Sequence, residues 1–181
     1  DTLYKCLEQI LSEYNILTER YALADELKLE LNDFTKKHYR ISSFTNNIDE
    51  KNIIRPLMVV HGKIKRIMSN GRYWTDILTP KILSSLQNKC FPICTDIRYS
   101  SYQTDELDWL KNKLKGVLIH IERILPNGQL LQPANSDEAE NNPKLKVAAD
   151  FHLKWPTTDD EQLRLDCVKI QLKSLIDKII N

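Results

Sequence analysis

Glycine is scarce in this sequence. Its four glycines, Gly62, Gly71, Gly116 and Gly128, are widely separated, whereas a loop that cradles nucleotide phosphates needs several glycines close together. The sequence also has no apolar run long enough to span a bilayer and no visible secretory signal peptide. We therefore expect no membrane partner and a cytoplasmic location, in the host cytoplasm if the source is a virus.

An excess of charge of either sign is also lacking. The 26 Lys and Arg residues nearly balance the 25 Asp and Glu residues, which leaves a formal net charge of +1. Proteins that bind nucleic acids or membrane surfaces in a general way show a basic excess. We therefore do not expect a nucleic-acid partner, although a local basic pocket is compatible with this balance.

The cysteines and histidines lack the spacing of a metal site. Cys90 and Cys94 are four residues apart around a proline, which is not a zinc-ligand pattern and indicates reduced, buried thiols. His38 and His152 have no neighbouring ligands at useful spacing. The order of the residues also indicates no Ser-His-Asp or Cys-His catalytic group.

Apolar residues recur at helical spacing in several segments. Most of these segments begin with a residue that caps helices, namely Asp25, Thr79, Thr104 and Thr158, the last in a capping box with Glu161. The expected helices cover 3–14, 25–34, 50–68, 79–86, 104–115 and 158–179.

Four short apolar runs predict strands at 16–24, 90–94, 117–123 and 147–155. One helix separates 90–94 from 117–123, which leaves no room for a hairpin, so these two are predicted to pair in parallel as a βαβ unit. We therefore predict an α/β fold with one parallel sheet and helices on both of its faces. At 181 residues the chain is expected to form a single domain.

Charged side chains stand at the exits of these strands: Asp25, Asp96, Arg98 and Arg123. The carboxyl ends of parallel strands share one edge of a sheet, where α/β proteins bind their ligands. An acid at the end of a buried strand resembles the Walker B aspartate, which helps to hold Mg²⁺. The planar fork of an arginine suits phosphate oxygens. Together these residues indicate a site for an anionic ligand.

Two of these residues have ordinary structural alternatives. An aspartate at a strand end often caps only a turn, and this alternative stays open for Asp96. Arg98 could instead form a salt bridge with Asp105 or Glu106. Because several cations converge on one predicted edge, we favour the ligand site.

Further candidate residues lie on the predicted helices. Lys28 lies one turn into a helix that follows a strand, and Arg55 shares its helix with Lys65 and Arg66. We expect Lys65 and Arg66 to be surface cations without a further role. Tyr73 and Trp74 follow a turn. Aromatic residues are more often part of the core than platforms for a base, and we favour the core alternative for Tyr73.

Five segments resemble a known family when their order is considered together. They are "DT" at 1–2, "LADELK" at 23–28, "IRPLMVVHGKIKR" at 54–66 followed by "GRYW" at 71–74, "CTDIRYSSYQTDELDWLKNKLKGVLIHIER" at 94–123, and "NSDEAENNPKLKVAADFHLKW" at 135–155. The chain is similar to the P-loop deoxynucleoside monophosphate kinases of bacteriophage type, and more distantly to animal phosphomevalonate kinases. In that family a phosphate loop ends at the position of Asp1 and Thr2. We therefore expect a strand and this loop to precede the chain.

The resemblance implies a three-layer kinase domain that uses ATP and Mg²⁺ to phosphorylate a deoxynucleoside monophosphate. It assigns 29–88 to a helical part that binds the acceptor. In the acceptor site, Asp25 and Lys28 would line the wall, Arg55 and Arg98 would hold the phosphate, and Trp74 would pack beside the base.

The resemblance also implies how the ATP side is built. Thr2 would lie near the ATP phosphates or Mg²⁺, and Asp96 would orient the metal ion or the neighbouring arginine. Arg123 and Glu138 would belong to a lid-like loop at 124–146 that closes over the transferred group.

Three alternatives stay open. The acceptor could be a modified base in DNA or phosphomevalonate, or the chain could be a nucleotide-binding module without catalysis. The kinase could also pair as a homodimer.

Overall fold

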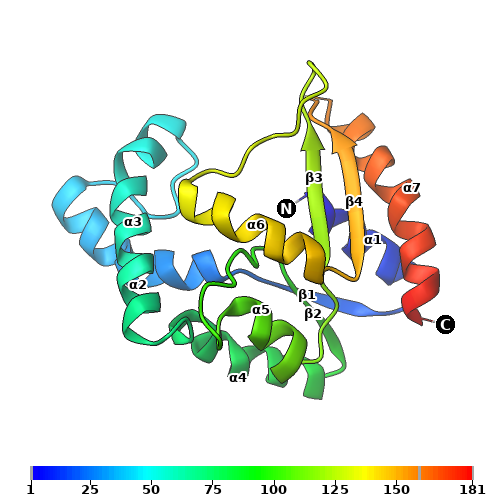
Figure 1. Cartoon of the computed structure of the whole chain (residues 1–181), viewed down its shortest axis with the longest axis horizontal. Helices are drawn as coiled ribbons and strands as arrows, with labels where there is room; N and C mark the ends of the chain where they lie inside the picture. Colours follow the sequence, from blue (N-terminus) through cyan, green and yellow to red (C-terminus); the bar gives the residue numbers. More distant parts are fainter. Residues whose placement is uncertain (1, 159, 181) are drawn as a thin grey trace.

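The structure is a computed structural model that describes residues 2–158 and 160–180. This part of the chain forms a mixed α/β fold with seven α-helices, one π-helical turn and four strands (Figure 1). In chain order the elements are α1 (Thr2–Glu13), β1 (Leu17–Tyr21), α2 (Leu23–Tyr39), α3 (Ile48–Met68), α4 (Tyr73–Gln87), β2 (Cys90–Cys94), α5 (Glu106–Asp108), η1 (Trp109–Lys113), β3 (Ile119–Ile124), α6 (Ser136–Ala148), β4 (Phe151–Pro156) and α7 (Glu161–Ile180). None of these helices combines the length and the apolar character needed to cross a membrane.

The strands form two separate parallel pairs. β1 pairs with β2, from Leu17 opposite Cys90 to Tyr21 opposite Cys94, and β3 pairs with β4 along its whole length. The predicted α/β class and the parallel pairing are confirmed. The predicted single sheet is wrong for the described residues, because β2 and β3, expected to form a βαβ unit, belong to different sheets. In Figure 1, β3 and β4 run upward while β1 runs across the picture.

Two helices extend beyond their predicted bounds. α2 continues to Tyr39 through a segment expected to be a loop, and it ends where Arg40 adopts a left-handed conformation with a φ of 58°. α4 begins at Tyr73, so Thr79 lies inside the helix instead of capping it. There the Thr79 hydroxyl oxygen accepts a hydrogen bond of 2.9 Å from the indole N–H of Trp109. The extension of α2 is polar and has no clear apolar stripe. The start of α4 does carry a stripe, with Trp74 and Leu78 on its buried side, and it was missed because Thr79 and Pro80 are typical of a helix start.

The predicted loop at 124–146 contains most of a helix, α6. The side chain of Asn135 caps it by accepting the N–H of Glu138 at 2.9 Å. α6 also includes Val147 and Ala148, which were expected to begin a strand, so β4 starts later, at Phe151. Polar residues dominate α6, and a polar helix leaves little periodic signal in the sequence.

Two other predicted caps are displaced by one or two residues. Asp105, not Thr104, caps the short helix α5. At α7, the Asp160 carboxylate accepts the N–H of Leu163 at 3.0 Å and therefore takes the role predicted for Thr158. The side chain of Glu161, the other half of the predicted capping box, lies outside the described residues.

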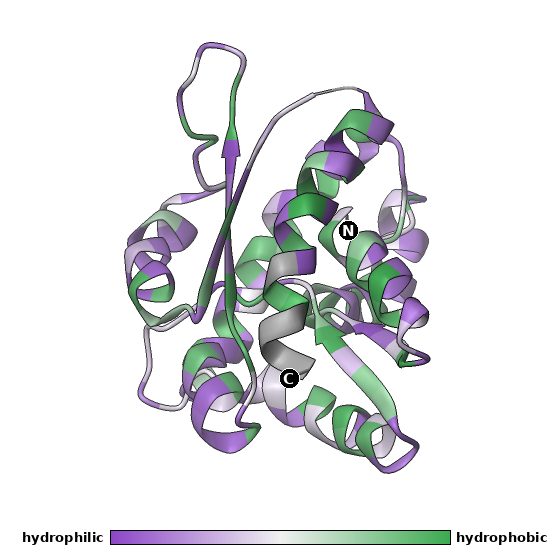
Figure 2. Cartoon of the chain, turned by 90° about the vertical axis from the view of Figure 1, so that its right-hand side faces the viewer, coloured by the Kyte–Doolittle hydropathy of each residue, from purple (hydrophilic) through white to green (hydrophobic). Residues whose placement is uncertain are grey.

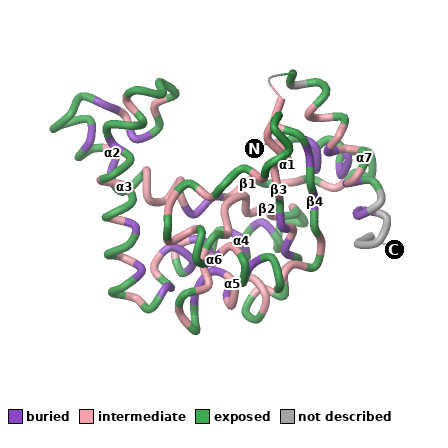
Figure 3. The backbone as a smooth tube through the Cα atoms, turned by 45° about the horizontal axis from the view of Figure 1, so that its top comes forward, coloured by how far each residue is buried: buried purple, intermediate pink, exposed green. Residues whose placement is uncertain are grey.

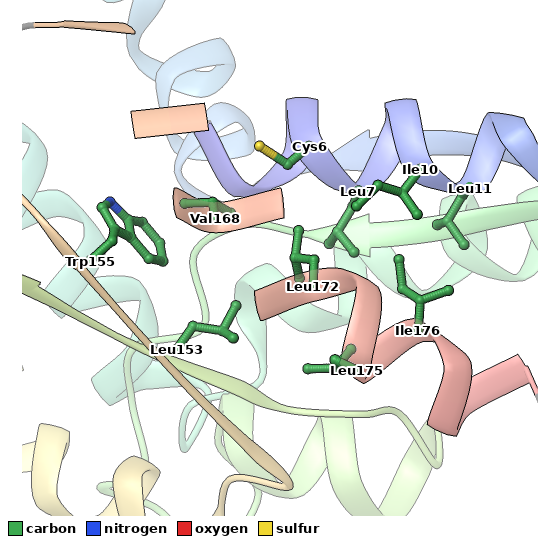
Figure 4. Packing of buried hydrophobic residues seen from close by; sticks show 10 residues of the cluster. All are labelled: Cys6, Leu7, Ile10, Leu11, Leu153, Trp155, Val168, Leu172, Leu175 and Ile176. Atoms are coloured by element: carbon green, nitrogen blue, oxygen red, sulfur yellow. The ribbon is translucent and has the colours of Figure 1, made fainter. Parts of the chain in front are cut away.

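Each strand pair has its own hydrophobic core. The β3–β4 pair packs against α1 and α7 (Figure 4), and the residues of this cluster are Cys6, Leu7, Ile10, Leu11, Leu153, Trp155, Val168, Leu172, Leu175 and Ile176. The β1–β2 pair is covered by the cluster of Leu23, Trp74, Leu78, Ile82 and Trp109. Hydrophobic and hydrophilic residues alternate along the helices (Figure 2), as expected of helices with one buried side.

The pair formed by α2 and α3 projects from the rest of the fold, and much of its surface is exposed (Figure 3). Gly62 lets the two helices approach closely, because a Cβ atom at this position would lie 2.7 Å from the Cδ1 of Leu27. This contact places the first turns of α2 beside the middle of α3.

We predict that Leu78→Ala lowers the free energy of unfolding by about 2–5 kcal/mol, because it leaves a cavity in a core that has little room to relax. Leu78 has no exposed surface, whereas Leu83 on the same helix is 46% exposed. The control Leu83→Ala should therefore change the free energy of unfolding by no more than about 0.5 kcal/mol. Urea unfolding followed by circular dichroism measures both, and equal losses would contradict the assignment of the core.

Candidate functional site

Asp96 joins the end of β2 to the start of α2. Its two carboxylate oxygens accept the backbone N–H groups of Leu23 and Ala24, each at 2.8 Å. The residue at the N-cap of α2, Ala22, has no side chain that could do this. Asp96 therefore caps a helix that follows the neighbouring strand, and its negative charge faces the positive end of that helix. Asp96 therefore acts as a backbone cap, the structural alternative that the sequence analysis left open. A role of Asp96 in holding a metal ion stays a prediction.

The first turn of α2 carries the next part of the site. Asp25 forms ion pairs with Arg20 at 2.7 Å and with Lys28 at 2.8 Å. Burial acts to raise the pKa of Asp25, but the hydrogen bonds from Lys28 and Arg20 outweigh it and hold the pKa below its ordinary value. Asp25 is therefore ionised at neutral pH, and Lys28 is held beside the carboxyl end of β1.

Arg98 extends from the same edge toward α6. Its guanidinium donates a hydrogen bond to a carboxylate oxygen of Glu138 at 2.8 Å, and 47% of the Arg98 side chain is exposed, against 15% for Glu138. Arg98 thus forms a salt bridge, as the structural alternative held, but its partner is Glu138 and not Asp105 or Glu106. Asp105 pairs with Arg66, and Glu106 accepts the backbone N–H of Arg98. Arg98 thus presents an accessible guanidinium whose present partner belongs to α6.

The backbone that carries Arg98 is held by a buried carboxylate. One oxygen of Glu106 accepts the N–H of Arg98 at 2.6 Å and the N–H of Tyr99 at 3.1 Å. Glu106 is almost fully buried. Burial, together with the negative charges of Asp96 and Asp105, raises its pKa to about 8. Glu106 therefore holds its proton far more tightly than an exposed glutamate.

A second buried carboxylate holds the following residues. Asp105 accepts the N–H groups of Ser101 and Tyr102 at 2.9 and 3.3 Å, and it pairs with the guanidinium of Arg66 at 2.6 Å. The Arg66 guanidinium also lies 3.6 Å from the ring centroid of Tyr99. Residues 98–102 therefore form a loop whose backbone N–H groups are held by the buried carboxylates of Glu106 and Asp105.

The burial of Arg66 corrects the sequence analysis, which expected a surface cation. Only 8% of its side chain is exposed. One signal was available: Arg66 follows Gly62 by four residues and Ile54 by twelve, and all three lie on the buried side of α3. Lys65 forms an ion pair with Glu30 at 2.7 Å and is partly exposed.

A small polar cavity opens beside Arg98 and Glu138. It has a volume of about 240 Å³ and lies between β3 and α6. His120, Glu122 and Asn142 contribute to its lining, and Nε2 of His120 lies 2.9 Å from the side-chain oxygen of Asn142. This cavity gives Arg98 a recess in which part of a ligand could lie.

The structure therefore brings Asp25, Lys28, Asp96, Arg98 and Glu138 together at the carboxyl ends of β1 and β2. The other candidates lie on other elements: Thr2 begins α1, Arg55 is exposed on α3, Arg123 lies in β3, and Trp74 lies in the core.

Trp74 is the candidate whose surroundings fit its predicted role least. It is 4% exposed, and its ring lies 4.8 Å from that of Tyr73 in an edge-to-face arrangement. Its indole therefore offers almost no surface to a base. The sequence analysis favoured the core alternative for Tyr73, but Trp74 is the more deeply buried of the two residues.

The described residues contain no group of three or more His, Cys, Asp or Glu side chains arranged to hold a metal ion. Mg²⁺ is commonly held by one or two carboxylates together with the phosphates of a substrate. Asp96 fits that limited role through Oδ2, which accepts the N–H of Ala24 and keeps a second lone pair, whereas Oδ1 accepts both the N–H of Leu23 and, at 3.7 Å, the thiol of Cys94.

No protein-family model, curated protein or solved structure matches this chain. The likeness to the deoxynucleoside monophosphate kinases therefore rests on the motifs in the sequence and on their order.

We predict that Glu106→Gln changes how stability depends on pH. The amide keeps an oxygen for the N–H groups of Arg98 and Tyr99 but cannot ionise. The pKa of Glu106 is about 8 in the folded protein, against an ordinary value of 4.5. The folded protein therefore binds this proton more tightly than the unfolded chain does. The stability that comes from this tighter binding is lost as the pH rises from 4.5 toward 8. The Gln variant does not lose this stability. The free energy of unfolding of the variant minus that of the wild type should therefore increase with pH, by up to about 1.4 kcal/mol per pH unit.

Urea unfolding at several pH values between 5 and 8 measures this difference. Glu13→Gln, the same substitution at an exposed position, is measured alongside as the matched control. A constant difference for Glu106→Gln would show that Glu106 titrates normally in the folded protein.

Proposed function

We propose that this protein is a nucleotide kinase that transfers the γ-phosphoryl group of ATP to a deoxynucleoside monophosphate. The observation that carries the proposal is the double hydrogen bond of Asp96 to the first turn of α2. It places the cations Lys28 and Arg98 at one edge of a parallel strand pair, where α/β proteins bind ligands. Phosphoryl transfer depends on positioning and charge neutralisation, and cations at fixed positions supply both.

Arg98 and Lys28 are the residues proposed to hold the acceptor phosphate. The guanidinium of Arg98 is accessible, while its backbone is held by Glu106. Lys28 is partly exposed beside Asp25 and lies 5.6 Å from the ring centroid of Phe44. A rigid backbone with an accessible cation loses little conformational entropy when a phosphate binds.

Glu138 links this site to α6. It pairs with Arg98, so a phosphate that binds Arg98 would compete with the Glu138 carboxylate. The phosphate would thereby weaken one contact of α6, while Lys63 of α3 still pairs with Asp137 of the same helix at 2.9 Å. This arrangement supports the proposed lid role for the segment 124–146.

Asp96 is the residue proposed to hold Mg²⁺, which would neutralise charge on the phosphates during transfer. The 181 residues contain no glycine-rich loop for the ATP phosphates. The acceptor site, in contrast, consists of residues of this chain, so acceptor binding is the direct test.

We predict that Arg98→Ala and Lys28→Ala each weaken the binding of a deoxynucleoside monophosphate about tenfold to a hundredfold. Each removes a charged hydrogen bond worth about 1.5–3 kcal/mol. Isothermal titration calorimetry with the four common deoxynucleoside monophosphates measures the dissociation constants. Lys113→Ala serves as the control, because Lys113 is exposed and pairs with Asp76 of α4, away from the cluster.

The corresponding deoxynucleosides should bind weakly to every variant, since they lack the phosphate that Arg98 and Lys28 would contact. Unchanged affinity in both Arg98→Ala and Lys28→Ala would refute the assignment. Binding of phosphomevalonate, or of DNA that contains a modified base, in place of the monophosphates would support another acceptor.

A further inference from the structure

Two histidines lie directly opposite each other on neighbouring strands. The parallel register of β3 and β4 pairs His120 with His152, and the centroids of the two rings are 5.9 Å apart. Paired residues of neighbouring strands project their side chains from the same face of a sheet. The two histidines are far apart in the sequence, so only the pairing of the strands brings their rings together.

The face that carries this pair is the one that α6 contacts. Ile119 and Leu153, which are adjacent to the two histidines in the chain, point to the other face and pack against the cluster formed by α1 and α7. α6 lies across the lower part of β3 in Figure 1, and its residues Asn142 and Lys146 form hydrogen bonds with side chains of β3. The histidine pair therefore lies outside the hydrophobic core, among polar side chains.

The surroundings of His120 determine which of its ring nitrogens carries the hydrogen. Nε2 lies 2.9 Å from the side-chain oxygen of Asn142. An amide oxygen only accepts hydrogen bonds, so Nε2 is the donor, and Nδ1 of the neutral ring then carries a lone pair. His120 is 7% exposed, and Nδ1 is buried without a hydrogen-bond partner among the described residues. Such buried, unpaired atoms are rare in proteins, and a bound ion or water is one explanation for them.

This arrangement is typical of a histidine that binds a metal ion. A metal-binding histidine usually donates its second ring N–H to an oxygen, which fixes the orientation of the ring. Asn142 supplies that oxygen for His120. Imidazole nitrogens suit Zn²⁺, Cu²⁺ and Ni²⁺, whereas Mg²⁺ prefers oxygen ligands. The free nitrogen of His120 therefore selects a transition-metal ion.

His152 can supply the second ligand. It is exposed, and no described residue forms a hydrogen bond with its ring. A Zn–N bond is about 2.0–2.1 Å long, so two imidazoles bound to one ion have ring centroids roughly 5–6 Å apart. The observed 5.9 Å already falls in this range. A rotation of the exposed His152 side chain is then enough to direct a ring nitrogen toward the same ion.

The charges around the pair are compatible with a bound cation. Glu122 follows His120 by two residues and therefore projects from the same face of the sheet. A hydrogen bond from Lys146 holds the pKa of Glu122 below its ordinary value, and the charges of Lys154 and His120 act in the same direction. Lys146 and Lys154 oppose a cation, but both are about half exposed, so solvent screens them. The ionised Glu122 offsets part of their charge.

We propose that His120 and His152 form a binding site for a divalent transition-metal ion such as Zn²⁺, with Nδ1 of His120 and one ring nitrogen of His152 as ligands and water at the remaining positions. Structural zinc sites have four protein ligands and catalytic sites three. Two ligands make an open site with an exchangeable ion, which agrees with the lack of a larger ligand group in the described part of the chain. The ion would link β3 to β4. The site shares no residue with the proposed acceptor site, and the inference does not depend on the proposed function.

A Zn²⁺ titration of the 181-residue chain, followed by ¹⁵N NMR of the histidine rings, tests the proposal. The ring signals of His120 and His152 should shift together and saturate at one ion per chain, with the largest change at Nδ1 of His120. The rings of His38 and His61 serve as internal controls and should not shift. Binding of Zn²⁺ to the free cysteines would leave the rings of His120 and His152 unchanged, so the spectra distinguish the two kinds of site.

His152→Gln removes one ligand at an exposed position, where the fold should tolerate the change. It should weaken Zn²⁺ binding at least tenfold in isothermal titration calorimetry, and it should abolish the rise in Tm that Zn²⁺ produces in the wild type. His38→Gln, the same substitution at an exposed histidine of α2, is the matched control and should keep the wild-type affinity.

Three results would overturn the proposal. The first is a titration in which the rings of His120 and His152 show no saturating shift. The second is an equal shift of all four histidines, which would indicate general binding at the surface. The third is unchanged Zn²⁺ affinity in His152→Gln, which would place the ion on other ligands.

Discussion

The carboxylate of Asp96 joins the end of one strand to the start of the helix that follows the neighbouring strand, and the candidate site depends on this contact. With both oxygens bound to the N–H groups of Leu23 and Ala24, the first turn of α2 cannot move independently of β2. Lys28 and Arg98, which come from distant parts of the sequence, are therefore kept at one edge. Without an acid at this position, the first turn of α2 would lack its side-chain cap, and this contact would no longer fix Lys28 of α2 relative to Arg98.

The separation of the strands into two pairs connects the site to the core. β2 and β3 line the same apolar cavity of about 550 Å³, and Thr95 and Ile97, the neighbours of Asp96 in the chain, line it as well.

The elements that could be predicted are those with a strong local signal. The amphipathic stripes of α1 and α7, with residues such as Leu7 and Leu172, and the apolar runs of β2 and β3 indicate their structure without reference to the rest of the chain. α6 was missed because polar residues dominate it. Its Asn135 cap is a local signal, but the burial of Asn141 depends on contacts with distant residues such as Ser100. The end of α2 was misjudged for a related reason, since residues 35–39 are mostly polar. The start of α4 was misjudged because Thr79 and Pro80 are typical of a helix start, although Trp74 and Leu78 already lie on its buried side.

The sequence by itself determined that the charged residues Asp25, Asp96 and Arg98 follow strands, because strand ends are marked by neighbouring residues. It also indicated parallel pairing, since no hairpin fits between the strands. Only the tertiary structure decided which strands pair and which carboxylates hold the loop that carries Arg98. Partner choice and the burial of Arg66 depend on contacts between segments far apart in the chain, and local patterns carry no information about such contacts. The same physical reason explains why the apolar cavity between β2 and β3 became visible only in three dimensions.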